Sequence, residues 1–319
     1  MWLKLRLYII MAILFAIVYG LVVFAANYVG ISGFFFYGVL ATVIMLIQYM
    51  IGPKMVEWSM GVHYVTEVEY PALHRMITEL SRASGIPKPR IGIARIPIPN
   101  AFAFGRWAKD GRVCVTEGIM NLLNEKELRA VLAHEISHLK NKDVAIITMI
   151  SVIPMICWYF AWNQFFSGGR ERGNGILIGI VALIIYLITN LLVLYVSRIR
   201  EYYADEGAVK LGSSPHHLAS ALYKLVYGSA RVSKESLKPI EGMKAFFVND
   251  PSRASRDIRE LSHIDLDGSG NIDINELMAL RTRPVKIKTT DKLMEMFSTH
   301  PNMLKRIQRL SSLQGISAY

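Results

Sequence analysis

Hydrophobic positions along the chain gather in four long runs that contain no Asp, Glu, Lys or Arg. The runs extend over Leu7 to Ala26, Phe34 to Ile51, Val144 to Phe166 and Ile176 to Ser197. Each is close to the roughly 20 residues that an α-helix needs to cross a hydrocarbon core. A buried helix of a soluble domain is the alternative for any one run. Four such runs together predict four transmembrane helices.

Polar segments separate the second run from the third and follow the fourth. Periodicity predicts a helix from Glu69 to Ser84, with Pro71 suited to its first turn. A second helix is predicted from Glu125 to about Asn141, because Asn124 and Glu127 form a capping-box-like pair at its start. The polar segments are therefore expected to fold into regular structure.

Three short stretches between these two helices predict β-strands: 91–96, 101–105 and 112–116. They form a small sheet directly upstream of the capped helix. An edge strand in this position can hold an extended peptide through backbone hydrogen bonds. A purely structural hairpin is the alternative interpretation.

Composition agrees with a membrane protein. The 319 residues are 52% hydrophobic and 19% charged, with a mean hydropathy of +0.31. The net charge of +11 comes without any nucleic-acid-binding motif, so an anionic membrane surface is the expected partner and nucleic acid is not. The basic residues beside the runs place both termini and both polar segments in the cytosol: Lys4, Arg6, Lys54, Lys140, Lys142, Arg198 and Arg200.

The candidate chemistry begins in the capped helix, with the pattern H-E-x-x-H. His134 and His138 are four residues apart and lie on one face of a helix, where both imidazoles can reach one metal ion. Glu135 lies beside the first histidine and can accept a proton from the attacking water. The pattern predicts a metal-dependent hydrolase.

Catalytic zinc usually has three protein ligands, and the residues just after His138 offer no third histidine. Glu201, directly after the fourth hydrophobic run, is the next strong candidate. An antiparallel hairpin of the third and fourth runs would return it to the level of His138. Asp205 lies one helical turn further on and can accept a hydrogen bond from a ligating histidine.

These motifs resemble the HtpX-type membrane zinc metalloproteases of peptidase family M48, which share their catalytic pattern with the Ste24-type CAAX proteases. The resemblance runs from the first hydrophobic run to the C-terminus, apart from the region around residue 270. It rests on Pro99-Asn100-Ala101-Phe102-Ala103, Ala133-His134-Glu135-Ile136-Ser137-His138, Glu201-Tyr202-Tyr203-Ala204-Asp205, and Ser298-Thr299-His300-Pro301 followed by Arg306.

The resemblance implies a role for each matching residue. Glu201 becomes the third ligand of one zinc ion (Zn2+), and Asp205 supports the ligand set. Asn100 is expected to contact the substrate backbone. His300 and Arg306 are expected near the scissile carbonyl, where they would stabilise the tetrahedral intermediate. The implied activity is zinc-dependent endoproteolysis of damaged or misfolded membrane proteins or unfolded polypeptides, as protein quality control and stress response.

The expected fold is a mostly α integral membrane protein of the plasma membrane. Four transmembrane helices accompany a cytosolic α+β zincin-like (gluzincin) catalytic domain with a small β-sheet. Its expected divisions are two transmembrane helices at 1–51, the first half of the protease domain at 52–143, a transmembrane hairpin at 144–197, and the second half at 198–319.

One further motif lies outside the protease pattern. Residues 265–276 match a calcium-binding EF-hand loop within an EF-hand-like segment of about 252–283. Gly270 occupies the sharp turn, and Ser269 stands where Asp or Asn is more usual. The loop predicts a Ca2+ site, with an acidic turn that binds no ion as the alternative. Its expected oxygen ligands are Asp265, Asp267, Ser269, Asn271, Asp273 and Glu276.

Two other functions remain open from the sequence. A CAAX-type prenyl-peptide protease would use the same zinc pattern, although that family usually has more membrane spans. A non-enzymatic, calcium-responsive membrane adaptor would need the metal site only for structure. Glu135 in the position of a general base favours an enzyme over the adaptor.

Overall fold

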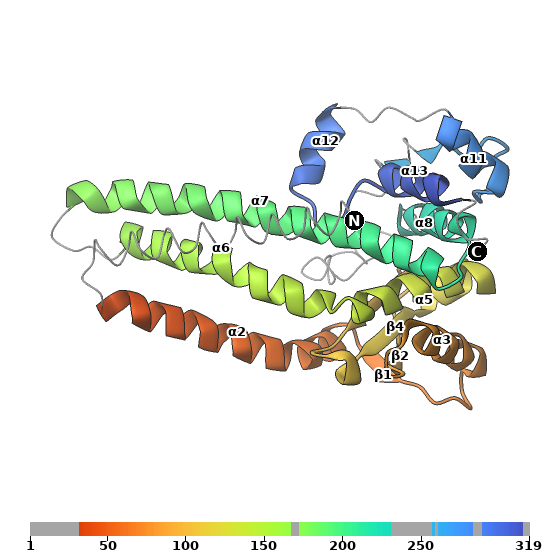
Figure 1. Ribbon diagram of the computed structural model, residues 1–319, viewed down its shortest axis with the longest axis horizontal. Helices are drawn as coiled ribbons and strands as arrows, with labels where there is room; N and C mark the ends of the chain where they lie inside the picture. Colours follow the sequence, from red (N-terminus) through yellow and green to blue (C-terminus); the bar gives the residue numbers. More distant parts are fainter. Residues whose placement is uncertain (1–31, 167–171, 231–256, 259–260, 283–288, 315–319) are drawn as a thin grey trace. The chain divides into compact units, whose positions relative to one another are not determined.

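The computed structural model describes residues 32–166, 172–230, 257–258, 261–282 and 289–314 (Figure 1). The chain divides into two compact units, each made of two separate stretches. One comprises Met1–Gly52 and Ala145–Ile199, and the other comprises Pro53–Val144 and Arg200–Tyr319. The predicted span at Leu7 to Ala26 lies outside the described residues.

The first unit contains the apolar parts of three helices: α2 (Ser32–Ser59), α6 (Asp143–Phe166) and α7 (Arg172–Lys210). Within this unit α6 contacts α7, where the rings of Trp158 and Tyr186 have centroids 5.2 Å apart. By length and composition, Ile176–Lys210 can cross a membrane. A second candidate among the described residues is the bent pair of helices that ends at Trp158. The predicted mostly helical fold is confirmed. Among the described residues, one or two helices are candidates for the four predicted spans.

The second unit contains a mixed four-stranded sheet in the order β1-β2-β4-β3. β2 and β4 are parallel, whereas β1 and β3 each pair antiparallel with their neighbours. The three predicted strands are confirmed. β1 was not predicted, because three residues are too few to show alternation. The bounds are Val62–Tyr64 (β1), Arg90–Ala94 (β2), Ala101–Phe104 (β3) and Arg112–Thr116 (β4).

The helices of this unit begin and end where local chemistry favours it. α3 (Pro71–Ser84) has proline in its first turn and ends at Gly85, whose φ of 72° is left-handed and unfavourable for other residues. The remaining described helices are α4 (Glu117–Leu122), α5 (Glu125–Lys140), α8 (Pro215–Ala230), α11 (Ile274–Thr282), α12 (Thr289–Met296) and α13 (Met303–Leu313).

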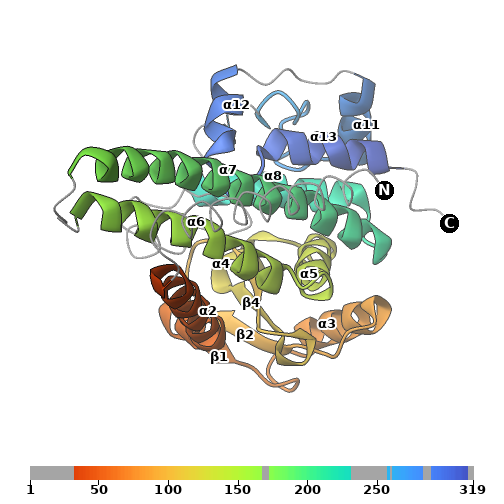
Figure 2. The same ribbon diagram turned by 60° about the vertical axis from the view of Figure 1, so that its left-hand side comes forward.

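Helix α5 is the central element of this unit. Figure 2 shows it between α8 on one side and α3 with the sheet on the other. The predicted capping box is present, and Glu127 also accepts hydrogen bonds from Ser220 and Lys224 of α8. These contacts fix the start of α5 against α8. They hold the helix through Glu127, which is buried in its first turn.

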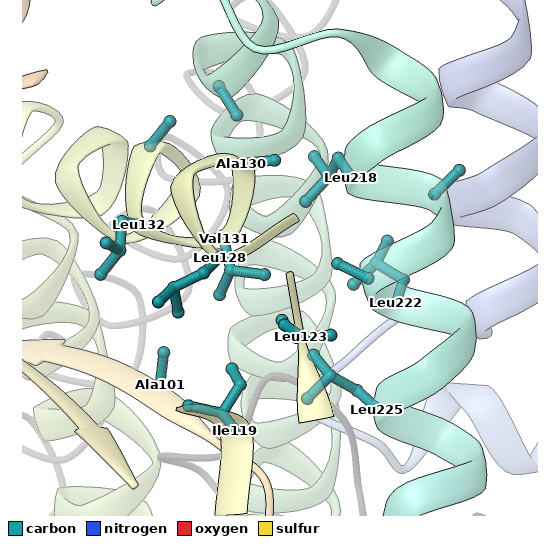
Figure 3. Packing of buried hydrophobic residues seen from close by; sticks show 14 of the residues in the cluster. Ala101, Ile119, Leu123, Leu128, Ala130, Val131, Leu132, Leu218, Leu222 and Leu225 are labelled. Atoms are coloured by element: carbon teal, nitrogen blue, oxygen red, sulfur yellow. The ribbon is translucent and has the colours of Figure 1, made fainter. Parts of the chain in front are cut away.

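The buried face of α5 is apolar on both sides (Figure 3). Leu128 and Val131 pack toward Ile119 and Ala101, and Leu222 of α8 lies opposite. Full burial of each large aliphatic side chain contributes roughly 1.5–3 kcal/mol. The helix that carries H-E-x-x-H is therefore held rigidly on two sides.

Candidate metal centre

The two histidines of α5 face the same point. His134 is almost fully buried and His138 is half-buried, and their Nε2 atoms are 3.1 Å apart. Their rings meet edge to face. Packing on both sides of α5 fixes the orientation of the helix. Both imidazole side chains therefore point to the same position.

The third member of the group comes from α7. The Glu201 carboxylate places one oxygen 3.5 Å from His134 Nε2 and the other 3.5 Å from His138 Nε2. A close helix approach makes this possible, because a Cβ atom added at Gly207 would lie only 2.4 Å from Ser137 Oγ of α5. Glycine therefore lets α7 approach α5 closely near the site. The predicted group of His134, His138 and Glu201 is confirmed.

The donor set suits a zinc ion. His134 Nδ1 is 2.9 Å from Asp205 and His138 Nδ1 is 2.5 Å from Asp143, and carboxylates only accept hydrogen bonds. Each Nδ1 therefore carries a proton, which leaves the two Nε2 atoms as the positions that can ligate a metal. Glu201 Oε2 is buried without a hydrogen bond among the described residues. Separations of 3.1–3.5 Å match the roughly 3.3 Å expected between ligands of one tetrahedral zinc.

Asp205 connects the ligands to the C-terminal helix. Arg306 of α13 is fully buried and donates two hydrogen bonds, of 2.7 and 2.9 Å, to the Asp205 carboxylate. Its Nη1 atom also lies 3.2 Å from Glu201. These two carboxylates raise the pKa of Arg306 and keep it charged. A buried charge of this kind persists only with such partners.

The negative charges around His134 favour a cation at its position. Burial lowers the pKa of His134, but hydrogen bonds to Asp205 and Glu201 outweigh it and raise the pKa to about 9. The same carboxylates would favour a metal cation at this position. Burial also raises the pKa of the neighbouring Glu135, against a backbone hydrogen bond from Ala103 of β3. A carboxylate with a raised pKa is a better proton acceptor near neutral pH.

The other predicted residues lie at different places around the group. His300 is buried with Nδ1 3.6 Å from Glu201, and neither ring nitrogen makes a hydrogen bond within the described residues. Asn100 is fully buried just before β3, with its backbone N–H donating to Thr116. The roles of His300, Arg306 and Asn100 toward substrate stay predictions.

Three residues at the site were not predicted from the sequence. Asp143 lies against His138, Arg200 is paired with Asp143 at 3.2 Å, and Gly207 allows the close helix approach. Two local signals were available: the glycine inside a helical pattern, and a carboxylate only five residues after His138. The contact between Arg200 and Asp143 joins residues that are far apart in the chain.

The calcium-like loop forms a second group of carboxylates. Oxygen atoms of Asp265, Asp267 and Glu276 lie within 4.8 Å of one another. Glu276, at the start of α11, accepts the backbone N–H of Leu266, and the Asp265 carboxylate accepts a hydrogen bond from Tyr223 of α8. Ser269, Asn271 and Asp273 take part in further hydrogen bonds within the loop. Exposed acidic groups are common without an ion, so calcium binding stays a prediction.

Comparison with known proteins identifies the family. Residues 67–314 match the model of peptidase family M48. The chain is 53% identical to an HtpX protease homologue of Methanothermobacter thermautotrophicus over 224 residues, which cover 70% of this chain and 86% of the relative. A second HtpX homologue, from Methanosarcina acetivorans, is 37% identical over 276 residues, covering 85% and 82% respectively.

A solved structure supports the fold. The crystal structure of S. mikatae Ste24p aligns with 96% of this chain and 67% of its own length, at a TM-score of 0.50 and 15% sequence identity. At this identity the likeness concerns the fold alone. The family match and the histidine–glutamate group agree with each other, and the chain therefore belongs to peptidase family M48 as a zinc metallopeptidase homologous to HtpX.

Proposed function

We propose that the chain is an integral-membrane endopeptidase that cleaves damaged or misfolded membrane proteins at the cytosolic face. One observation carries this proposal: Glu201 lies on the same unbroken helix as the fourth apolar run, which ends at Ser197. At 1.5 Å per residue, the ligand follows that run by ~6 Å of helix. A metal group so close along the chain to a membrane segment suits substrates that emerge from the bilayer.

The apolar surface of α7 supports its place in a membrane. Seven large hydrophobic residues on it are exposed, at the i, i+3, i+4 spacing of helix faces. An exposed apolar surface of this extent is rare on a soluble monomer. The residues are Ile176, Leu177, Ile180, Val181, Ile184, Leu187 and Ile188. Together with the other three hydrophobic runs, they support the proposal of four spans. The basic residues beside the runs support the placement of both termini in the cytosol.

The proposed chemistry uses residues of α5, of the C-terminal segment and of the chain just before β3. Zinc, when bound, supplies a Lewis acid that lowers the pKa of water and polarises a peptide carbonyl. Glu135 accepts the proton of the attacking water and later delivers it to the leaving amine. His300, whose ring nitrogens make no hydrogen bond among the described residues, opposes negative charge on the carbonyl oxygen. Arg306 adds to this charge stabilisation, and Asn100 binds the substrate backbone.

The proposal is tested by proteolysis of an unfolded membrane protein with wild type and Glu135→Gln. We expect the variant to bind zinc normally and to lose roughly 10²- to 10⁴-fold in rate, because only the proton acceptor is removed. Undiminished cleavage by the zinc-loaded variant would refute the assigned role of Glu135. Glu125→Gln, an exposed glutamate at the start of the same helix, is the matched control.

A CAAX-type prenyl-peptide protease is the second candidate function, favoured by the fold shared with Ste24p. A prenylated C-terminal peptide offered beside the same unprenylated peptide and the unfolded membrane protein separates the two. Cleavage confined to the prenylated peptide would establish the alternative. A non-enzymatic adaptor would cleave none of the three while still binding zinc.

We propose in addition that the loop at 265–276 binds calcium. The spacing of its oxygen-bearing residues and the convergence of Asp265, Asp267 and Glu276 support this. The test is a calorimetric titration of the full-length, zinc-loaded protein with calcium chloride. Saturable heat that disappears in Glu276→Gln supports the site. No heat at millimolar calcium removes it, and that result leaves the proposed peptidase activity untouched.

A further inference from the structure

The second zinc histidine has its own carboxylate partner. Asp143 Oδ2 lies 2.5 Å from His138 Nδ1, and Asp143 is almost fully buried. The arrangement repeats that of His134, whose Nδ1 meets Asp205. A carboxylate on the far nitrogen fixes the tautomer and the orientation of an imidazole, and it directs Nε2 toward the metal.

The carboxylate of Asp143 is itself held by an arginine. Arg200 Nε lies 3.2 Å from the same Asp143 oxygen that meets His138. Arg306 pairs with Asp205 through two hydrogen bonds, whereas Arg200 and Asp143 form an ion pair in which Arg200 Nε has no hydrogen bond within the described residues. Arg200 also directly precedes the ligand Glu201, so one ion pair connects the positions of His138 and Glu201.

The backbone before Asp143 is in an unusual conformation. Lys142 has φ of +57°, and it is the single non-glycine residue with positive φ among the described positions. A side chain with a Cβ atom disfavours this region. Helix α5 ends at Lys140, and the left-handed Lys142 directly precedes α6, whose first residue Asp143 contacts His138. An unfavourable conformation that persists beside a functional group is consistent with a selected geometry.

We propose that Asp143 is a positioning residue that holds His138 with Nε2 toward zinc, and that Arg200 holds Asp143 in place. The inference rests on the zinc site of the proposed function. Asp143 and Arg200 also lie at the two points where the chain leaves and re-enters the catalytic unit. The ion pair therefore joins these two crossing points directly to a zinc ligand.

A purely structural role for the pair is the competing explanation, and a charge swap separates the two. Asp143→Arg combined with Arg200→Asp restores an ion pair but leaves His138 Nδ1 facing a donor. We expect the swap to keep the thermal midpoint of the zinc-free protein near that of wild type. We expect zinc affinity to fall by roughly 10- to 100-fold, the usual effect of losing such a partner.

Zinc affinity is measured by competition with a chromogenic chelator on the purified full-length protein, and geometry by the absorption spectrum of the cobalt-loaded form. Asp143→Asn, which keeps the volume, should weaken zinc and change the cobalt spectrum, and should lower kcat more than it raises KM. Glu125→Gln, which breaks an exposed ion pair with Arg75, should change none of these.

The proposal would be overturned if Asp143→Asn and the charge swap both kept the zinc affinity and the cobalt spectrum of the wild type. Should the swap unfold, Asp143→Asn and Arg200→Gln carry the test, with the smaller effect expected for Arg200→Gln. Failure of wild type itself to bind zinc would instead refute the proposed function, so the two failures are distinguishable.

Discussion

The two candidate metal-binding groups of this protein differ in the partners that their polar atoms have when no metal is bound. In the group of His134, His138 and Glu201, the two Nε2 atoms and the Glu201 carboxylate face one another, and Glu201 also pairs with Arg306 at 3.2 Å. In the loop at 265–276, backbone N–H groups of the loop itself already satisfy the carboxylates, as at Ser269 and Asp273. The first group is buried, and most of the loop is exposed.

This difference shows how metal dependence arises. A buried polar atom without a hydrogen bond, such as Glu201 Oε2, costs about 1–3 kcal/mol, so a bound cation would stabilise the first group. The loop loses little without an ion, because its acceptors keep their internal hydrogen bonds. We therefore expect zinc to contribute strongly to stability and calcium to contribute weakly. The following predictions test that contrast, beginning with the largest effect.

Glu201→Gln should have the largest effect. It removes a charged zinc ligand and leaves Arg306 with only Asp205 as an anionic partner. We expect zinc affinity to fall by more than the roughly 100-fold that marks the upper end for supporting residues. Chelator competition measures it. Glu206→Gln, on the same helix and paired with Lys210, is the control and should bind zinc normally.

Arg306→Ala should lower the free energy of unfolding, because two buried carboxylates depend on this arginine. It leaves Asp205 and Glu201 as buried charges without their arginine, at a cost of roughly 3–5 kcal/mol. Thermal unfolding in detergent would report it as a lowered midpoint. Arg309→Ala is the control on the same helix, because that arginine is partly exposed and its ion pair is long, at 3.9 Å. Equal midpoints for the two variants would contradict the prediction.

Gly207→Ala tests whether close helix approach sets the ligand geometry. The added methyl group would overlap Ser137, so we expect a loss of about 1–3 kcal/mol in the free energy of unfolding. Zinc affinity should also fall, since α7 carries Glu201. Gly52→Ala, where the new methyl group meets nothing within 4 Å, should leave both properties unchanged.

Glu276→Gln should have the smallest effect on stability. The amide oxygen can still accept the N–H of Leu266, but the N–H of Asp273 loses its acceptor. We therefore expect a loss of about 1 kcal/mol in the absence of calcium. The change in stability is measured by unfolding wild type and Glu276→Gln with and without a calcium chelator. A large loss in the calcium-free protein would show that the loop depends on its charges in the way the zinc group does.

Local patterns predicted much of the fold. Asn124 and Glu127 marked the start of α5, and Pro71 marked that of α3, because capping and proline preferences depend on neighbouring residues alone. Strand β1 was too short to be recognised, and α4 gave no periodic pattern over its six residues. The metal group was predicted in full, because Glu201 followed an apolar run long enough to form a hairpin with its predecessor.

The sequence by itself determined the H-E-x-x-H face, since a helical repeat places His134 and His138 together wherever the helix forms. Only the tertiary structure decided what surrounds that face. Asp143 and Arg200 meet because two chain crossings lie side by side, and Arg306 reaches Asp205 because α13 packs within the same unit. Such contacts depend on burial and close packing between distant segments, and no short-range pattern in the chain records them.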